Sequence, residues 1–289
     1  MIDIHTHTTY SDGSSSVEEI LKEANKSNIN IFSITDHNTI DAYDEVKKLR
    51  HLFSGNIISG VEITTTYKGE TIEVLGYGFD LDKMKKLLSE NVLTFEEKQL
   101  KEFELIKNQY KKIGVKFKEE NIIFDPKVES SRVAFVKEIK KYPDNFKFFL
   151  YESSITTDSG FTRNEVYNPK SPLYVDESSL FPSLEKTIDM IHSAGGLAFL
   201  AHVYAYSKNI SEELINILDN YNLDGLECFY TTFTDEQSMY LVDLCKKRFL
   251  YMSGGSDFHG TRKINHNLGI GSGNLNINDE IITSWCNFL

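Results

Sequence analysis

The chain has 289 residues, of which 40% are hydrophobic and 26% charged, and its formal net charge is −12 at pH 7. This apolar content, with 15 tyrosines and 19 phenylalanines, excludes a wholly disordered chain, and the acidic balance disfavours a protein that coats long DNA or RNA. The three cysteines are typical of reduced thiols, and no secretory signal or membrane-length apolar run is seen, so we expect a cytoplasmic protein without membrane contact.

Short β-rich segments alternate with amphipathic helical patterns along most of the chain. After a first strand at residues 2–4, Ser16 and Glu19 have capping-box spacing ahead of a helix that presents Val17, Ile20, Leu21 and Ala24 on one face. The remaining predicted strands are 31–34, 56–61, 72–75, 197–201, 225–228 and 249–252, and the remaining helices lie near 42–49, 184–192, 214–218 and 239–245. Strands separated by helices favour a mainly parallel sheet. About seven such strand–helix units suit a sheet that closes into a barrel better than a short open sheet. We therefore predict an α/β fold, a distorted seven-stranded (β/α) barrel.

One stretch interrupts this alternation. Residues 83–179 are rich in lysine and glutamate in a helical pattern with phenylalanines spaced along it, which we expect to form a core of their own. The sequence thus predicts a metal-binding barrel domain made of residues 1–82 and 180–289, with residues 83–179 as a helical insertion that caps it.

Five of the eight histidines lie in short motifs beside acids, each at the carboxyl end of a predicted strand. The residues concerned are His5 and His7 with Asp12, then His37, Glu62, His202, and finally Asp257 with His259. In a parallel barrel these strand ends converge on one face, where active sites are built. Imidazole and carboxylate ligands without nearby cysteines suit catalytic zinc, manganese or ferrous iron rather than a structural zinc site. The other three histidines, His51, His192 and His266, are not expected to be ligands.

These motifs resemble the PHP (polymerase and histidinol phosphatase) domain family, and within it the stand-alone phosphoesterase branch of nucleotide phosphatases and a 5′-to-3′ exoribonuclease. Gly60-Val-Glu62, Ala201-His202 and the segment 255–260 carry the resemblance, which runs from residue 2 to about 260 and is weakest in the insertion. It implies two or three divalent ions, manganese, iron or zinc. The implied ligands are His5, His7, Glu62 and Asp257 for the first ion, Glu62 and His202 for the second, and Asp12, His37 and His259 for the third.

One position departs from the family pattern. Glu73 stands where close relatives usually carry a histidine. As a ligand it would make the second site richer in oxygen and favour manganese over zinc; facing solvent, it would leave that site weak or empty. We predict that Glu73 is a ligand.

The resemblance implies a metal-dependent phosphoric ester hydrolase in which metal-bound hydroxide attacks phosphorus, with no side chain identified as the general acid. From five arginines we select Arg132, which matches a Ser-Arg segment of the branch, and Arg262 as phosphate-binding residues. The expected substrate is a small nucleotide, a 3′,5′-bisphosphate or a monophosphate. The alternatives are a 5′-to-3′ exonuclease on short RNA, a histidinol-phosphatase-like enzyme, a hydrolase of C–N bonds, and a non-catalytic metal-stabilised scaffold. No obligate protein partner is evident.

Overall fold

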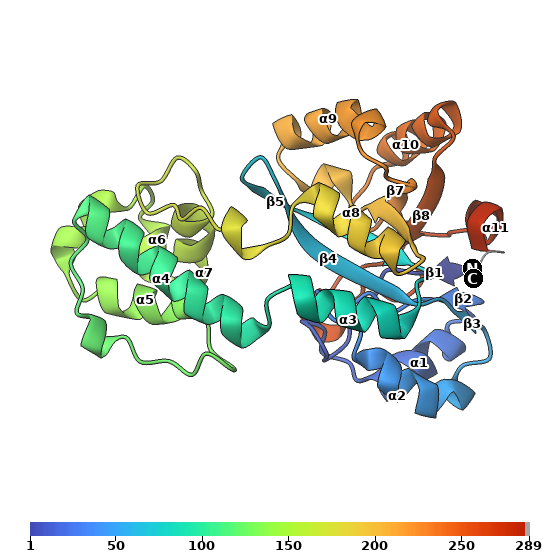
Figure 1. Cartoon of the computed structure of the whole chain (residues 1–289), viewed down its shortest axis with the longest axis horizontal. Coiled ribbons are helices and arrows are strands. Elements are labelled where there is room, and N and C mark those ends of the chain that lie inside the picture. The colour runs from blue at the N-terminus through green and yellow to red at the C-terminus, as the bar shows by residue number, and fades with distance from the viewer. Residues whose placement is uncertain (287–289) are drawn as a thin grey trace. The chain divides into compact units, whose positions relative to one another are not determined.

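The computed structural model describes residues 1–286 and divides into two compact units. The first comprises residues 1–92 together with the chain from Pro182 onward, and the second is Leu93–Phe181. All strands of the described residues belong to the first unit (Figure 1).

The strands of the first unit form two sheets. A three-stranded parallel sheet has the order β1-β2-β3, and a five-stranded sheet has the order β4-β5-β6-β7-β8. Their bounds are β1 Ile2–Asp3, β2 Ile31–Phe32, β3 Asn56–Ile57, β4 Gly60–Tyr67, β5 Glu70–Tyr77, β6 Leu197–Leu200, β7 Gly225–Tyr230 and β8 Tyr251–Gly255. The α/β class is therefore confirmed, whereas a single continuous seven-stranded barrel is not among the sheets that residues 1–286 form.

The prediction of a mainly parallel arrangement is wrong for the middle of the chain. Strands β4 and β5 pair antiparallel along their whole length, and β5 also pairs antiparallel with β6, while β6, β7 and β8 are parallel. No helix separates β4 from β5. Lys68 and Gly69 both have positive φ angles, as a tight hairpin turn of the type I′ class requires.

The two sheets are linked beside the ends of their strands. A parallel bridge joins Thr6, just beyond β1, to Phe258, just beyond β8, and another joins His37, beyond β2, to Glu62 on β4. These links bring the carboxyl ends of β1, β2 and β8 close to one another and to the start of β4.

Helices cover the sheets of the first unit (Figure 1). They are α1 Val17–Lys26, α2 Ala42–Leu49, α3 Leu81–Asn91, α8 Leu184–Ser193, α9 Lys208–Ile217, α10 Asp235–Arg248 and α11 Glu280–Cys286. Helix α1 begins with the predicted capping box, in which Ser16 and Glu19 bond reciprocally, and the four residues of its predicted apolar face are buried.

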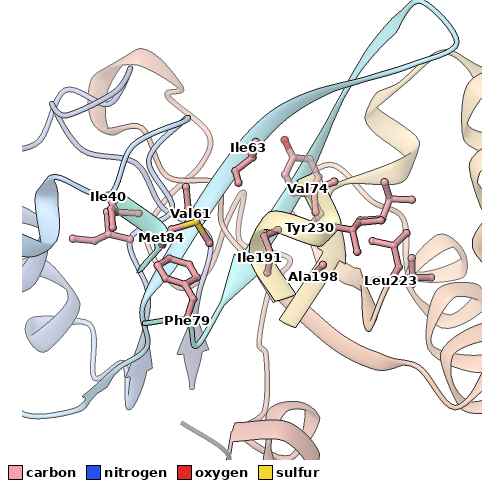
Figure 2. Packing of buried hydrophobic residues seen from close by; sticks show 14 of the residues in the cluster. Ile40, Val61, Ile63, Val74, Phe79, Met84, Ile191, Ala198, Leu223 and Tyr230 are labelled. Atoms are coloured by element: carbon pink, nitrogen blue, oxygen red, sulfur yellow. The ribbon is translucent and has the colours of Figure 1, made fainter. Parts of the chain in front are cut away.

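The core of this unit is continuous across strands and helices. Figure 2 shows Val61 and Ile63 of β4 and Val74 of β5 in one cluster with Met84 of α3 and Ile191 of α8. Because Met84 and Leu88 are buried, α3 belongs to the first unit, and the second unit begins about ten residues later than the predicted insertion.

The second unit is helical. It contains α4 Phe95–Ile113, α5 Ser131–Ile139, α6 Ser153–Thr156 and α7 Asp158–Phe161. Its own buried cluster includes Ile106, Tyr110, Phe135 and Phe161, with Phe103 and Phe117 packed against it. Most aromatic residues of this region thus build its core, as the sequence predicts, whereas Phe95 at the start of α4 is exposed.

Two further sequence expectations are addressed by the structure. Cys228 and Cys245 are free, buried thiols, whereas the side chain of Cys286 lies outside the described part of the chain. Within residues 1–286, none of the helices is both long and apolar enough to cross a bilayer.

Candidate metal centre

All nine predicted ligands lie near one another in the first unit. They follow β1, β2, β6 and β8, or lie on β4 and β5, with Asp12 in the loop before α1. Four overlapping groups have potential ligand atoms within 4.8 Å of one another: His7, Asp12, His37 and His259; His5, Glu62 and His202; His5, His7 and Asp257; and His37, Glu62 and Glu73.

Glu62 lies at the middle of these groups and is 1% exposed. Its Oε2 atom is 3.3 Å from His5 Nε2, 3.2 Å from His7 Nε2 and 3.3 Å from His37 Nδ1. Its Oε1 atom is 2.9 Å from His202 Nε2. One carboxylate thus faces four imidazoles, which is the arrangement expected of a ligand shared between two ions.

The Glu73 carboxylate faces the same imidazoles. Its Oε1 atom is 3.4 Å from His37 Nδ1, and its Oε2 atom is 3.2 Å from His202 Nε2. The backbone N–H of Glu73 donates to the hydroxyl of Tyr206, at 2.8 Å. This orientation favours the predicted ligand role over a solvent-facing side chain.

Asp12 is the most exposed of the nine, with half of its side chain accessible. Its Oδ1 atom is 3.0 Å from His259 Nε2 and 3.7 Å from both His7 Nδ1 and His37 Nε2. Buried Asp36 organises the loop that carries it, accepting hydrogen bonds from the N–H and hydroxyl of Thr8 and from the hydroxyl of Ser11.

Unusual backbone conformations turn two of the predicted ligands inward. His202 and Asp257 have φ angles of +23° and +53°, in a region that non-glycine residues rarely adopt. Asp257 is held there by its N–H, which donates to the carbonyl of His5 at 2.9 Å. Such conformations cost about 1–3 kcal/mol each and cluster at functional sites.

The polar atoms of the cluster are poorly satisfied by the protein alone. Six buried ligand atoms have no hydrogen-bond partner: His5 Nε2, His7 Nε2, Asp12 Oδ1, His37 Nδ1, His202 Nδ1 and His259 Nε2. A buried polar atom without a partner costs about 1–3 kcal/mol. Divalent cations would supply the missing partners, and the mixture of imidazole and carboxylate suits manganese, iron or zinc.

Close packing of acids and imidazoles shifts their pKa values. Burial by itself lowers the pKa of His7, but the nearby carboxylates of Asp257 and Glu62 outweigh it and raise the pKa to about 9. In the same way, burial is outweighed by Glu62 and Glu73 at His202, whose pKa rises to about 10. Burial by itself raises the pKa of Glu62. The charges of His5 and His37 have a larger, opposite effect and hold this pKa well below its usual range.

Loading the metal-free protein with manganese at pH 7 is expected to release about three protons, one each from His5, His7 and His202. The pKa values of His7 and His202 are about 9 and about 10. Burial lowers the pKa of His5, but the charges of Glu227 and Glu62 outweigh it and raise that pKa well above its usual value. All three imidazoles are therefore protonated at pH 7, and a cation binds only the neutral form. Calorimetric titration in buffers of different ionisation enthalpy measures this release. It should fall toward zero as the pH rises above about 10, and manganese binding at pH 7 without proton release would contradict the raised pKa values.

The two arginines predicted to bind phosphate have different environments. In the second unit, Arg132 of α5 is 10% exposed and pairs with two carboxylates, Glu102 and Glu177, with its Nε 3.0 Å from Glu177 Oε1. Arg262 is exposed in the 3₁₀ turn Gly260–Arg262 of the first unit. Arg132 is thus already neutralised within its own unit, and phosphate binding by either arginine stays a prediction.

Sequence reasoning missed three residues that contact the predicted ligands. Glu227 on β7 is buried, with its Oε1 2.8 Å from His5 Nδ1, while its Oε2 accepts the N–H of His202 at 2.8 Å. Tyr230 donates its hydroxyl to Asp257 Oδ2 at 2.7 Å, and Lys263 Nζ lies 2.6 Å from the same oxygen. In the sequence, Glu227 is an acidic residue within the apolar segment 225–230, and this placement indicates a buried carboxylate with a specific partner.

Comparisons with known proteins show which family this chain resembles. The family model described as the PHP domain matches residues 3–233. The 5′-3′ exoribonuclease of Haemophilus influenzae is 26% identical over 99% of this chain and 98% of its own length. The 3′,5′-nucleoside bisphosphate phosphatase of Chromobacterium violaceum is 23% identical over 92% of this chain and 90% of its own length. The crystal structure of a candidate metal-dependent phosphoesterase from Bifidobacterium adolescentis superposes with a TM-score of 0.63 at 22% identity, covering 97% of this chain and 94% of that one. The chain belongs to the PHP domain family.

Proposed function

We propose that this protein hydrolyses a phosphomonoester of a small nucleotide, a 3′,5′-bisphosphate or a monophosphate, with two or three divalent ions. Its family and its relatives make it a phosphoester hydrolase, and the relatives named above act on nucleotides or RNA. The convergence of five histidines and four acids on one site, with six of their atoms lacking a partner, is the observation that carries the proposal.

The proposed ligand sets are those that the family resemblance implies, with Glu73 added to the second. His5, His7, Glu62 and Asp257 would hold one ion, Glu62, Glu73 and His202 a second, and Asp12, His37 and His259 a third. The contacts of His202 with Glu62 at 2.9 Å and with Glu73 at 3.2 Å support the second set. Bound divalent ions would supply a hydroxide at neutral pH and neutralise charge on the phosphoryl oxygens. Glu73 adds an oxygen ligand to the second set, which favours manganese there.

The side chains around these ligands have supporting roles in the proposal. Glu227 fixes the ring of His5, and Tyr230 holds the outer oxygen of Asp257. Burial and the charge of Asp257 raise the pKa of Tyr230 far above its usual range, so its hydroxyl remains a donor at neutral pH. The phosphate contacts of Arg132 and Arg262 belong to the same proposal.

We also infer that the two sheets together form a distorted barrel of seven strands. This inference counts β3 and β4, separated by only two residues, as one strand. The bridges Thr6–Phe258 and His37–Glu62 support it, because each joins strands of different sheets.

Trimming of short RNA from its 5′ end is the second candidate function. The exoribonuclease of H. influenzae, which matches this chain over nearly its full length, favours it. The net charge of −12 counts against long nucleic acids, whose affinity depends on lysine and arginine contacts with phosphates.

Steady-state kinetics separate the two candidates. One manganese-loaded preparation is assayed on adenosine 3′,5′-bisphosphate and on a short RNA with a 5′-phosphate. We expect kcat/KM to be at least about tenfold higher for the bisphosphate, a difference of about 1.4 kcal/mol in transition-state stabilisation. A preference for RNA would establish the exonuclease instead. Hydrolysis of cyclic amides without any phosphate release would overturn both.

A further inference from the structure

A positive charge beside the metal ligands helps to hold an anionic substrate, and Lys263 lies in such a position. Lys263 forms an ion pair with Asp257, one of the nine predicted ligands. Among the ion pairs of the described residues, no other lysine or arginine pairs with a predicted ligand. The Nζ atom of Lys263 is 2.6 Å from Asp257 Oδ2, and 38% of the lysine side chain is exposed. The ammonium group is therefore next to the cluster and within reach of solvent.

The two oxygens of Asp257 face different surroundings. Oδ1 lies 3.3 Å from His7 Nε2 and 3.6 Å from His5 Nε2, on the side of the candidate metal ligands. Oδ2 accepts the hydroxyl of Tyr230 and lies beside Lys263. The lysine is thus on the outer side of the carboxylate, away from the atoms that would bind a cation.

Asp257 has contacts other than Lys263 that orient it. Tyr230 already satisfies Oδ2, and the N–H of Asp257 is bonded to the carbonyl of His5. An ammonium group has three N–H donors, and the contact with Asp257 occupies one of them. The other two remain available for the oxygens of a ligand.

The loop that carries Lys263 is anchored at both ends. Before the lysine, the N–H of Thr261 donates to Ser14 Oγ at 2.8 Å. After it, His266 Nδ1 donates to the carbonyl of Ser256 at 3.0 Å. Gly260 opens this loop with a φ of +64°, and a Cβ there would meet Ser14 Oγ at 2.1 Å. The backbone at Lys263 is therefore held in a defined position within the loop.

We propose that Lys263 forms the phosphate-binding subsite of this centre, where its ammonium group contacts a non-reacting oxygen of the substrate's phosphoryl group. The inference rests on the proposed phosphoesterase function and names the side chain that receives the anion. A lysine suits this role because it is a compact point charge with several donors. Arg132, by contrast, is already paired with Glu102 and Glu177.

The test measures binding of inorganic phosphate to manganese-loaded protein by calorimetry, for the wild type and for Lys263→Met. A hydrogen bond to a charged group contributes about 1.5–3 kcal/mol, so phosphate affinity should fall about 10- to 150-fold in Lys263→Met. KM for the nucleotide should rise by a similar factor, with a smaller change in kcat and with bound manganese unchanged. Lys263→Arg should recover part of the affinity, and Lys247→Met, at an exposed lysine of α10, should match the wild type.

Two results would overturn the subsite. Unchanged phosphate affinity in Lys263→Met with full manganese content would show that the ammonium does not bind the anion. A loss of manganese in the same variant would show that Lys263 orients Asp257 instead. Wild-type protein that binds manganese but neither binds phosphate nor hydrolyses any phosphoester would refute the proposed function itself, and this outcome is distinct from the other two.

Discussion

Replacing His7 by alanine is expected to lower phosphoester hydrolysis by at least about 10³-fold, equal to about 4 kcal/mol of transition-state stabilisation, and to reduce bound metal. His7 belongs to two of the four ligand groups, so its loss weakens both. Its Nε2 atom lies 3.2 Å from Glu62 Oε2 and 3.3 Å from Asp257 Oδ1, while its Nδ1 faces Asp12 at 3.7 Å.

Metal content by elemental analysis and phosphate release should be measured on the same preparations, with circular dichroism to establish that the variant is folded. His51→Ala is the matched control, since His51 is exposed in the 3₁₀ turn Arg50–Leu52. Full activity in His7→Ala would refute a metal centre at this site. Full metal content with lost activity would assign His7 a role other than ligand.

Eight of the nine predicted ligands stand out in the sequence because their chemistry and their placement coincide, whereas Glu73 is selected from the family resemblance. His5 and His7 flank Thr6 directly after β1, and Asp257 and His259 follow β8 in the same manner. Residues at i and i+2 of extended chain point the same way, which places His5 and His7 toward one site, whereas Asp257 reaches it through its positive φ angle. Polar residues at the ends of apolar strands are visible without knowledge of the fold.

The antiparallel part of the sheet does not follow from an alternation of strands and helices. Residues 62–71 contain no helical pattern, so no helix connects β4 to β5 as a parallel pair requires. The Lys68-Gly69 pair at the turn, followed by a strand of β-branched and apolar residues, was the sequence signal of a hairpin. To predict whether neighbouring strands are parallel or antiparallel, the turn residues between them are needed as well as the hydrophobic periodicity.

The residues that support the ligands could not be assigned from sequence. Glu227 and Tyr230 lie within β7, a strand that supplies none of the nine ligands, and their partners His5 and Asp257 are distant in the chain. Glu102 and Glu177, which neutralise Arg132, are likewise distant from it in sequence. Contacts of this kind depend on packing of strands and helices, which local patterns do not determine.

Replacing Glu227 by glutamine is expected to weaken metal binding about 10- to 100-fold, the usual effect of removing a partner that orients a ligand histidine. Glu227 accepts at both oxygens, from His5 Nδ1 at 2.8 Å and from the N–H of His202 at 2.8 Å. When His5 binds a cation through Nε2, Nδ1 carries the proton, so both partners of Glu227 are donors. The amide of glutamine has only one acceptor oxygen, and its NH₂ group would face a second donor.

This mismatch lies in a fully buried place, since Glu227, His5 and the backbone around them are inaccessible to water. Leaving one donor without an acceptor costs about 1–3 kcal/mol, so we also expect a lower melting temperature for the metal-free variant. Competition with a chelator of known affinity measures manganese binding, and Glu18→Gln, an exposed acid of α1, serves as the control. If Glu227→Gln binds manganese as tightly as the wild type, Glu227 does not orient His5 for the metal, and the hydrogen bond between them is a feature of the fold alone.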